Sequence, residues 1–369
     1  MSDPVGEGNT YHSLRIAEVR PETDRAVLVA FEVPDALRDT FRFIQGQYLT
    51  LRTAVGGETI ERCYSICSGV DDDELRVAIK RVDGGLFSNH ANEALRAGGV
   101  LDVMPPRGNF HTPLRRDNEK HYMCICAGSG ITPILSIVKS ILSREPKSLV
   151  TLLFGNRNSA TVMFRDELTY LKNRYLTRLC WINLLSREQQ DVEVLNGRLN
   201  NRKGGELQRR RLIDVAGVDE FFLCGPQSMI SEVSMGLRLS GAKDSHIHYE
   251  LFFASPQDSE RAIDRHRARA SRYRGQICDV TVKVAGRSSR FELTPDGENI
   301  LDAAMNAGAD LPFSCKNGVC ATCKARVLEG KIEMDLNHAL TEREIADGFV
   351  LACQAHPISE KIVIDFDQP

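Results

Sequence analysis

The sequence predicts a multidomain chain: an antiparallel β-barrel, then an α/β domain with a parallel sheet, then a small α+β module of the β-grasp class. Three observations support this order. Short apolar strands separated by glycine turns fill residues 10–113, and strand and helix patterns alternate over residues 114–254. Residues 276–369 combine a hairpin, one short helix and a cysteine-rich loop. A chain of 369 residues has room for about two or three domains of this kind.

The first domain reads as short strands joined by turns. Glycines at Gly46, Gly56 and Gly84 mark the turns, and one helix is expected over about residues 86–96. Apolar or alternating stretches rich in β-branched residues predict strands at residues 13–19, 26–33, 48–53 and 75–82. We therefore expect a small antiparallel barrel.

The pattern changes from residue 121 onward. A short apolar strand at 123–127 is followed by two glycines and then by apolar residues at helical spacing. Further strands are predicted at 149–154, 179–185 and 221–223, with helices at 164–174 and 227–239. This alternation implies a parallel sheet that is covered by helices on both faces.

Residues 255–275 are rich in arginine and lack a long apolar stripe, so we expect an exposed linker there. A short linker would hold the last module at high effective concentration near the rest of the chain. In that module we expect a hairpin at 279–284 and 290–293, a helix near 299–307, and a final strand at 361–366.

Composition is that of an ordinary soluble globular protein, with 42% hydrophobic and 26% charged residues. The start of the chain has no basic segment followed by an apolar run, and no stretch approaches the ~20 apolar residues of a membrane-spanning helix. Basic residues are not gathered with aromatic ones, which argues against nucleic-acid binding. We expect a cytoplasmic protein without a membrane partner.

The net charge of −3 is unevenly distributed. Residues 276–369 hold 15 acidic and 9 basic side chains, a balance of −6, whereas the remainder holds 35 acidic and 38 basic ones, a balance of +3. An acidic module joined to a mildly basic one suggests electrostatic docking, although charged faces that merely meet solvent would look the same.

Four of the eleven cysteines form one motif, Cys315, Cys320, Cys323 and the more distant Cys353. Three clustered thiols and one distant thiol are the ligand spacing of a plant-type [2Fe–2S] cluster, and Gly318 lets the loop approach the cluster closely. The alternative is a structural zinc site, which usually shows two short ligand pairs. The other seven cysteines mostly lie in apolar runs and are expected to be buried free thiols in a reducing compartment.

A flavin site is suggested by two segments of the first domain. Arg62, Tyr64 and Ser65 on one strand supply a cation for phosphates, an aromatic face and a hydroxyl for the reactive edge of the ring. Gly85 and Ser88 open a helix whose N-terminus suits an anion, with the serine as cap. A surface arginine beside a core tyrosine, and an ordinary capped helix, are the alternatives.

A dinucleotide loop is suggested by Gly128, Gly130 and Thr132 between a strand and a helix, although Pro133 stands where the third glycine of the fingerprint belongs. Ser186 and Arg187 follow a strand and suit the 2′-phosphate of NADPH, with Arg157 as a helper. Solvent-facing arginines are the alternative.

Two further candidates lie at the end of the α/β domain. Cys224 and Gly225 end its last predicted strand, where ligands bind in open α/β sheets, and Cys224 reads as a contact to the nicotinamide because hydride transfer needs no nucleophile. Glu250 either approaches the flavin–nicotinamide pair or caps a strand. We take Ser65, Cys224 and Glu250 as the candidate catalytic residues.

Taken together, these motifs resemble the ferredoxin-NADP reductase superfamily with a C-terminal plant-type ferredoxin domain, over about residues 10–367. The cluster loop, with the segments 330–334 and 351–354, is most similar to reductase components that serve phenylacetyl-CoA epoxidase; reductases of 3-ketosteroid 9α-hydroxylase look similar too. By this resemblance Arg62, Tyr64, Ser65 and Ser88 hold FAD, Thr132 and Cys224 line the nicotinamide pocket, and Ser186 and Arg187 select NADPH.

The resemblance implies an NAD(P)H-dependent flavoprotein that passes electrons through FAD and a [2Fe–2S] cluster to the oxygenase of a multicomponent monooxygenase, in phenylacetate catabolism. Because both groups of reductases share the cofactor motifs, a Rieske-type oxygenase remains the alternative partner. A stand-alone flavin reductase is disfavoured because it would not need the ferredoxin module. A non-enzymatic iron–sulfur sensor is disfavoured because both nucleotide sites look complete.

Overall fold

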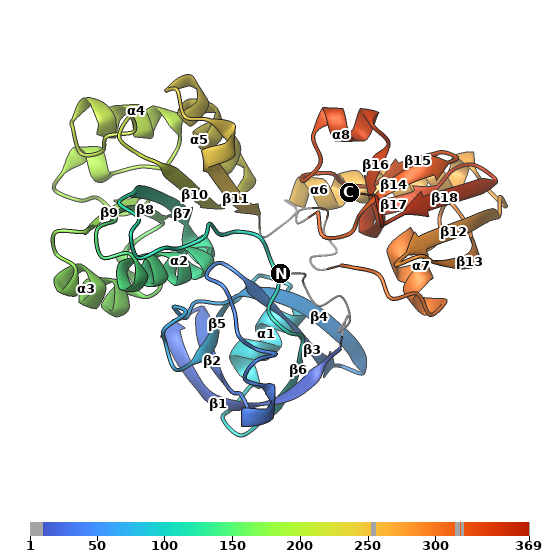
Figure 1. Cartoon of the computed structure of the whole chain (residues 1–369), viewed down its shortest axis with the longest axis horizontal. Helices are drawn as coiled ribbons and strands as arrows, with labels where there is room; N and C mark the ends of the chain where they lie inside the picture. Colours follow the sequence, from blue (N-terminus) through green and yellow to red (C-terminus); the bar gives the residue numbers. More distant parts are fainter. Residues whose placement is uncertain (1–9, 252–255, 314–317, 319–320, 369) are drawn as a thin grey trace. The chain divides into compact units, whose positions relative to one another are not determined.

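The computed structural model describes residues 10–251, 256–313, 318 and 321–368. The chain divides into two compact units, one spanning Tyr11–Phe252 and the other containing Phe253–Pro369. The first holds an antiparallel and a parallel sheet, and the second a mixed sheet with helices (Figure 1). The predicted fold classes are therefore confirmed. Over the described ranges, no helix is long and apolar enough to cross a membrane.

The barrel is a six-stranded antiparallel sheet in the order β4-β3-β6-β1-β2-β5. An antiparallel bridge between Ile66 and Val77 joins the two outer strands and closes it. Leu14, Leu49 and Val77 are completely buried inside, as the alternation of apolar side chains requires. The elements are β1 His12–Thr23, β2 Ala26–Glu32, η1 Asp35–Leu37, β3 Tyr48–Val55, β4 Glu58–Ser65, β5 Leu75–Lys80, α1 Leu86–Glu93 and β6 Val100–Val103.

The α/β domain has five parallel strands in the order β11-β10-β7-β8-β9. Helices α2 and α3 cover one face, and α4 and α5 cover the other (Figure 1). Ile134, Val138 and Ile141, spaced by helical turns on α2, are completely buried. The elements are β7 His121–Ala127, η2 Gly128–Gly130, α2 Ile131–Arg144, β8 Leu149–Asn156, η3 Ser159–Thr161, α3 Arg165–Arg174, β9 Leu179–Leu185, η4 Glu193–Leu195, α4 Asn201–Arg209, β10 Glu220–Gly225, α5 Gln227–Leu239, η5 Asp244–His246 and β11 Ile247–Leu251.

The barrel and the α/β domain share one hydrophobic cluster. Leu28 and Ala78 from the barrel belong to the same buried group as Ile137 of α2 and Phe222 of β10. Apolar burial across the boundary is the dominant favourable term for holding two such domains together. The flavin and nicotinamide motifs therefore lie on parts of one compact unit.

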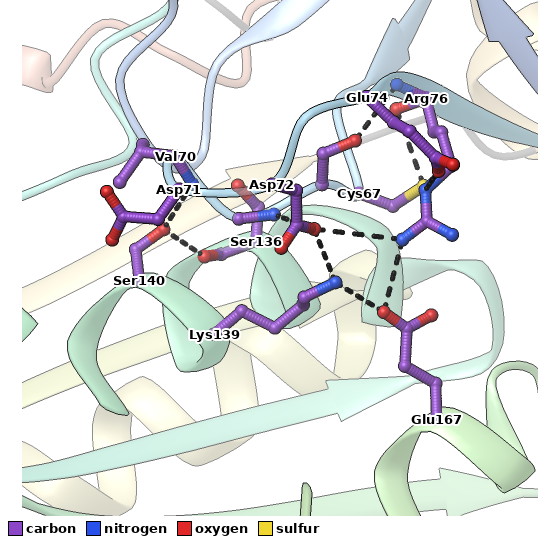
Figure 2. A network of polar contacts seen from close by, with 12 residues as sticks. Cys67, Val70, Asp71, Asp72, Glu74, Arg76, Ser136, Lys139, Ser140 and Glu167 are labelled. Carbon is purple, nitrogen blue, oxygen red and sulfur yellow. Dashed lines mark hydrogen bonds and ion pairs between the residues drawn. The ribbon is translucent and has the colours of Figure 1, made fainter. Parts of the chain in front are cut away.

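A network of ion pairs adds specific contacts at this boundary (Figure 2). Nη2 of Arg76 in β5 lies 3.1 Å from Oε1 of Glu167 in α3. Lys139 of α2 contacts Glu167 and also Asp72, in the turn before β5. The side chains of Arg76, Lys139 and Glu167 are only 10%, 14% and 20% exposed. The network thus ties β5 to α2 and α3 in a largely water-excluded place.

The second unit is built on a mixed sheet in the order β13-β12-β18-β14-β16, in which β12 and β18 are parallel, with a separate antiparallel pair β15-β17. Its core includes Val280, Ile300 and Ile362, all completely buried. The elements are α6 Pro256–Arg272, β12 Cys278–Val284, β13 Arg287–Leu293, α7 Ile300–Asn306, β14 Lys324–Glu329, β15 Ile332–Met334, α8 Glu342–Ala346, β16 Phe349–Leu351, η6 Ala352–Gln354, β17 Ala355–Pro357 and β18 Lys361–Asp365.

The segment expected to be an exposed linker is largely the helix α6. Its Arg269 is among the largest fully buried side chains, so the expectation of exposure fails there. The sequence pattern gives no sign of this burial, because the helix buries a charged side chain and not an apolar stripe. The sequence pattern also fails to predict helix α4. Its sequence is largely polar, and Leu207 is its buried residue.

Candidate functional site

The turn between β7 and α2 packs closely against the end of β10. A Cβ atom on Gly130 would lie 2.2 Å from the carbonyl oxygen of Cys224, a distance that no side chain tolerates. Gly128 has a φ of 56°, in the region where glycine is favoured. The fold therefore brings the glycine turn and the Cys224-Gly225 segment together at the carboxyl edge of the sheet, where open α/β sheets bind ligands.

Positive charge lies beside this turn. A Cβ atom on Gly128 would be 3.5 Å from Nζ of Lys80, at the end of β5. Burial lowers the pKa of Lys80, and the nearby charges of Arg157 and Arg25 lower it further. Cations beside backbone N–H groups at a helix start suit a phosphate. Sequence reasoning missed Lys80, because a single lysine at a strand end gives no signal until the barrel meets the α/β domain.

Thr132 lies in the first turn of α2 and is almost completely buried, at 3% exposure. Its hydroxyl donates a hydrogen bond of 3.0 Å to the carbonyl oxygen of Ser129. This bond fixes the conformation of the glycine turn, so Thr132 shapes the surface that a bound nucleotide would contact.

Ser65, Cys224 and Glu250 come together from distant parts of the sequence. The Ser65 hydroxyl, at the end of β4, donates to Oε2 of Glu250 in β11 at 3.2 Å. Glu250 is the direct neighbour of Cys224 in the β10–β11 register. One hydroxyl from the barrel therefore contacts a carboxylate of the parallel sheet, and the strand register places that carboxylate beside Cys224.

The thiol of Cys224 is kept neutral. Burial raises its pKa well above the ordinary value, and the nearby carboxylate of Glu250 raises it further. Because the thiolate is the nucleophilic form, this environment suits a packing contact and not covalent catalysis.

The flavin motif on β4 presents its side chains in different ways. Arg62 is exposed, and its Nη1 donates to the carbonyl oxygen of Glu61 at 2.7 Å. The ring of Tyr64 lies 5.4 Å from that of Phe87 in α1, and burial raises the pKa of the Tyr64 phenol. Ser65 is buried. An exposed cation, a neutral aromatic ring and a buried hydroxyl within four residues of one strand fit a flavin nucleotide.

The start of α1 differs in detail from expectation. Gly85, not Ser88, occupies the cap position. The Ser88 hydroxyl accepts from the Val82 N–H at 3.1 Å and donates to the Gly85 carbonyl at 3.3 Å. A Cβ atom on Gly85 would lie 2.6 Å from Oγ of Ser88. The glycine is therefore required by the turn that the buried serine holds.

The ends of β8 and β9 place two arginines on adjoining segments. The N–H groups of Ser186 and Arg187 donate to the carbonyl oxygens of Asn156 and Arg157 at 3.0 and 2.7 Å. Both arginine side chains are exposed at the carboxyl edge of the sheet. The Ser186 hydroxyl donates to the Asn156 carbonyl at 3.2 Å. This pair of exposed guanidinium groups can bind a phosphate through charge-assisted hydrogen bonds.

The cluster motif lies partly outside the described residues, which include Cys323 and Cys353 but not Cys315 or Cys320. Cys323 and Cys353 are buried, at 2% and 3% exposure, and their segments touch because the Ala352 N–H donates to the Cys323 carbonyl at 3.0 Å. Gly318 has a φ of 72°, and a Cβ atom there would lie 3.0 Å from Cγ of Gln354. Two buried thiols on adjoining segments, with a glycine of positive φ packed against Gln354, fit a [2Fe–2S] cluster.

Most of the other cysteines are buried, as expected. Cys180 is exposed and Cys63 is half-buried. Cys67, Cys124, Cys126, Cys224 and Cys278 are buried. Small apolar core positions account for these five.

Three family models match successive parts of the chain. Residues 16–112 match the oxidoreductase FAD-binding domain, and residues 124–235 match the oxidoreductase NAD-binding domain. Residues 282–357 match the 2Fe-2S iron-sulfur cluster binding domain. These matches establish FAD, a nicotinamide nucleotide and a [2Fe–2S] cluster as the cofactors.

Curated relatives match almost the whole chain. One of the subunits of the 1,2-phenylacetyl-CoA epoxidase of Escherichia coli K12 is 42% identical, covering 97% of this chain and 98% of its own. The ferredoxin reductase component of the 3-ketosteroid-9-alpha-monooxygenase of Rhodococcus rhodochrous is 32% identical, covering 98% and 99%.

Solved structures share the fold. Phthalate dioxygenase reductase matches with a TM-score of 0.65 at 20% identity, covering 97% of this chain and 98% of that one. A ferredoxin NADP⁺ reductase from Neisseria gonorrhoeae with bound FAD and NADP has a TM-score of 0.56 at 21% identity, covering 66% of this chain and 99% of that one.

Proposed function

We propose a partner for this chain, which belongs to the oxygenase reductase components with FAD-binding, NAD-binding and [2Fe–2S] domains in one polypeptide. The chain delivers electrons from NADPH to a phenylacetyl-CoA epoxidase. The observation that carries the choice of partner is the 42% identity to a component of that epoxidase, against 32% to a steroid monooxygenase component, each over nearly the full length of both chains. We place the protein in the cytoplasm, where buried thiols stay reduced.

When bound, the three groups turn a two-electron hydride transfer into delivery of single electrons: NADPH reduces FAD, and the cluster passes the electrons on singly. The protein binds these groups, orients them and excludes water. Its residues divide into a nicotinamide side, a flavin side and a cluster loop.

On the nicotinamide side, Gly128 and Gly130 let the backbone approach the pyrophosphate, and Lys80 adds a positive charge beside them. Thr132 holds the turn, and the neutral thiol of Cys224, together with Gly225, would contact the nicotinamide. These roles rest on the close packing of the turn against the end of β10.

The hydrogen bond between Ser65 and Glu250 connects the flavin side to the nicotinamide side. The hydroxyl of Ser65 is held by Glu250, so both groups are oriented before a ligand arrives. We assign Ser65 to the reactive edge of the flavin ring and Glu250 to the orientation of that hydroxyl. Removing either should then affect hydride transfer more than nucleotide binding.

On the flavin side, Arg62 supplies charge for the phosphates and Tyr64 an aromatic face. Gly85 and Ser88 shape the start of α1, whose first N–H groups would bind an anionic phosphate. The choice of NADPH over NADH is assigned to Ser186 and Arg187, with Arg157 on the adjoining segment.

The cluster is assigned to Cys315, Cys320, Cys323 and Cys353. The acidic balance of −6 over residues 276–369, which is 15 acidic against 9 basic side chains, suits docking against a basic patch on the oxygenase. Such contacts weaken as salt screens charges over about 8–10 Å, so delivery to the oxygenase should slow with ionic strength.

The experiment is reconstitution with purified oxygenases. The chain is combined with the other epoxidase components and phenylacetyl-CoA, and separately with the oxygenase of 3-ketosteroid 9α-hydroxylase and its steroid. NADPH-dependent product is expected only with the epoxidase. Turnover only with the steroid enzyme would overturn the choice of partner. A chain that reduces neither, yet rapidly reduces a small acceptor, would favour a stand-alone flavin reductase.

A further inference from the structure

Arg269, in the last turn of α6, is unusual because it is a buried arginine. Its side chain is completely buried, although it carries a full charge. Nη1 donates to Oδ1 of Asp335 at 2.7 Å, and Nε donates to the carbonyl oxygen of Pro295 at 2.9 Å. Among the described residues, its buried Nη2 has no hydrogen-bond partner. A charge buried at such desolvation cost is retained only where its partners hold it well.

Asp335 is held from two sides. Nε2 of the buried His356 lies 3.1 Å from Oδ2, and Arg269 takes the other oxygen. Burial alone would raise the pKa of Asp335, but the hydrogen bonds from His356 and Arg269 outweigh it and lower the pKa to about 2. Asp335 is therefore a fixed negative charge near neutral pH, balanced by Arg269.

The backbone around Asp335 is fixed to the same helix. Nη1 of Arg265 donates to the carbonyl oxygens of both Met334 and Asp335, at 2.7 Å each. Two arginines of α6, one turn apart, thus grip one short segment through its side chain and its backbone. This is a docked helix and not a free tether.

The segment held by these arginines contacts two described parts of the cluster motif. The Asp335 N–H donates to the carbonyl oxygen of Gln354, the neighbour of the cluster ligand Cys353, at 2.9 Å. Three residues further on, the His338 N–H donates to the carbonyl oxygen of Gly318 at 3.0 Å. The segment 334–338, which we call the backing segment, therefore contacts both the loop around Gly318 and the segment of Cys353.

We propose that Arg269, acting through Asp335, is a positioning residue of the [2Fe–2S] site: it holds the backing segment against Gly318 and the segment of Cys353, and it balances the partly buried negative charge of Asp335. The inference rests on the cluster of the proposed function but not on the identity of the oxygenase. Helix α6 would then contribute to the function of the cluster module and not only connect it to the rest of the chain. Neither the family motifs nor the cysteine spacing assigns such a role.

The inference separates packing from charge. Loss of Arg269 should loosen the backing segment, and should leave Asp335 as a negative charge without its arginine partner, which opposes entry of an electron. Loss of the Asp335 charge should loosen the segment too, but leaves the positive charge of Arg269, which favours the electron. A purely structural contact would not move the cluster potential in opposite directions.

The test uses the full-length protein loaded with FAD and cluster. Variants are Arg269→Met, Arg269→Lys and Asp335→Asn, with Arg267→Met as the matched control, because Arg267 lies on the same helix and is 76% exposed. Two quantities are measured: the rate at which an iron chelator removes the visible absorption of the cluster, and the cluster midpoint potential in a redox titration followed by electron paramagnetic resonance. FAD content and flavin reduction by NADPH serve as internal references.

Arg269→Met is expected to speed cluster loss about tenfold, the effect of losing one charge-assisted hydrogen bond, and to lower the potential. Asp335→Asn should raise the potential, and Arg269→Lys should keep it near that of the unmodified chain. Arg267→Met should leave both quantities unchanged. If Arg269→Met loses its cluster before measurement, Asp335→Asn and Arg269→Lys carry the test of sign.

A cluster in Arg269→Met that resists the chelator as well as in the unmodified chain would overturn the proposal. So would potentials that stay constant, or that shift in the same direction, in Arg269→Met and Asp335→Asn. Neither measurement requires an oxygenase, so failure of the proposed partner leaves this test intact, and the reverse also holds.

Discussion

The hydroxyl of Ser65 in the barrel donates a 3.2 Å hydrogen bond to the carboxylate of Glu250 in the parallel sheet, 185 residues away in sequence. In the β10–β11 register, Glu250 is also the neighbour of Cys224. This contact brings the three candidate catalytic residues together at the boundary of the two domains. The first prediction follows from it.

Ser65→Ala and Glu250→Ala should each slow flavin reduction by NADPH about tenfold or more, because each removes a hydrogen bond to a charged group worth roughly 1.5–3 kcal/mol. Glu250→Gln keeps an acceptor oxygen and should lose much less. The measurement is stopped-flow bleaching of the flavin over a range of NADPH concentrations. If Glu250 only caps a strand, Glu250→Ala will lower the melting temperature and leave the rate unchanged.

Cluster ligation gives a prediction that separates the modules. Cys320→Ser or Cys353→Ser should abolish the visible absorption of the [2Fe–2S] cluster and the resonance of its reduced form, because a thiolate ligand is lost. Flavin reduction by NADPH should persist, since the flavin residues lie in the other compact unit. Cys180→Ser, which changes an exposed thiol, is the control. An intact cluster in both ligand variants would refute the assignment.

Nucleotide choice should depend on Arg187. Arg187→Ala should lower kcat/KM for NADPH about tenfold to a hundredfold, the effect of losing a charge-assisted phosphate contact worth roughly 1.5–3 kcal/mol, and should leave NADH almost unaffected. Arg174→Ala is the control, because that exposed arginine ends α3, at the opposite edge of the sheet. Equal use of NADPH and NADH by the unmodified chain would show that Ser186 and Arg187 simply face solvent.

The ion pairs at the boundary of the two domains, part of which Figure 2 shows, should contribute to the free energy of unfolding according to their burial. Lys139→Met leaves Glu167 and Asp72 underpaired and should lower the free energy of unfolding by about 3 kcal/mol. Arg144→Met breaks a pair with Asp71 whose side chains are 50% and 46% exposed, and should cost less than about 1 kcal/mol. Urea unfolding followed by flavin fluorescence measures both. Equal losses would contradict the view that burial decides.

Local sequence is informative where chemistry demands fixed spacing. The cysteine spacing predicted a [2Fe–2S] domain because Cys315, Cys320 and Cys323 lie close together in the chain, and the glycine turn at 128–130 is local in the same way. The strand and helix pattern predicted the sheets for the same reason. The role of each cysteine as a ligand stays a prediction. Ser65 and Glu250 could be named individually, but their contact depends on how the barrel meets the α/β domain.

The features that sequence missed depend on tertiary contacts of charged side chains. Lys80 gains its place beside Gly128 only when β5 reaches the α/β domain. Arg269 looked like one of several solvent-facing arginines, because burial of a guanidinium contradicts every local pattern of polarity. Its partner Asp335 lies 66 residues away. Patterns of hydrophobicity cannot reveal a helix that docks through a buried ion pair.

The most direct measurement of the central claim is coupled turnover by the unmodified chain and by Cys353→Ser, each with the other phenylacetyl-CoA epoxidase components, NADPH and phenylacetyl-CoA. One epoxide per NADPH is expected with the unmodified chain. With Cys353→Ser almost no epoxide is expected, although NADPH still reduces the flavin. Epoxide formation by Cys353→Ser at the rate of the unmodified chain would contradict the claim that electrons reach the oxygenase through the cluster.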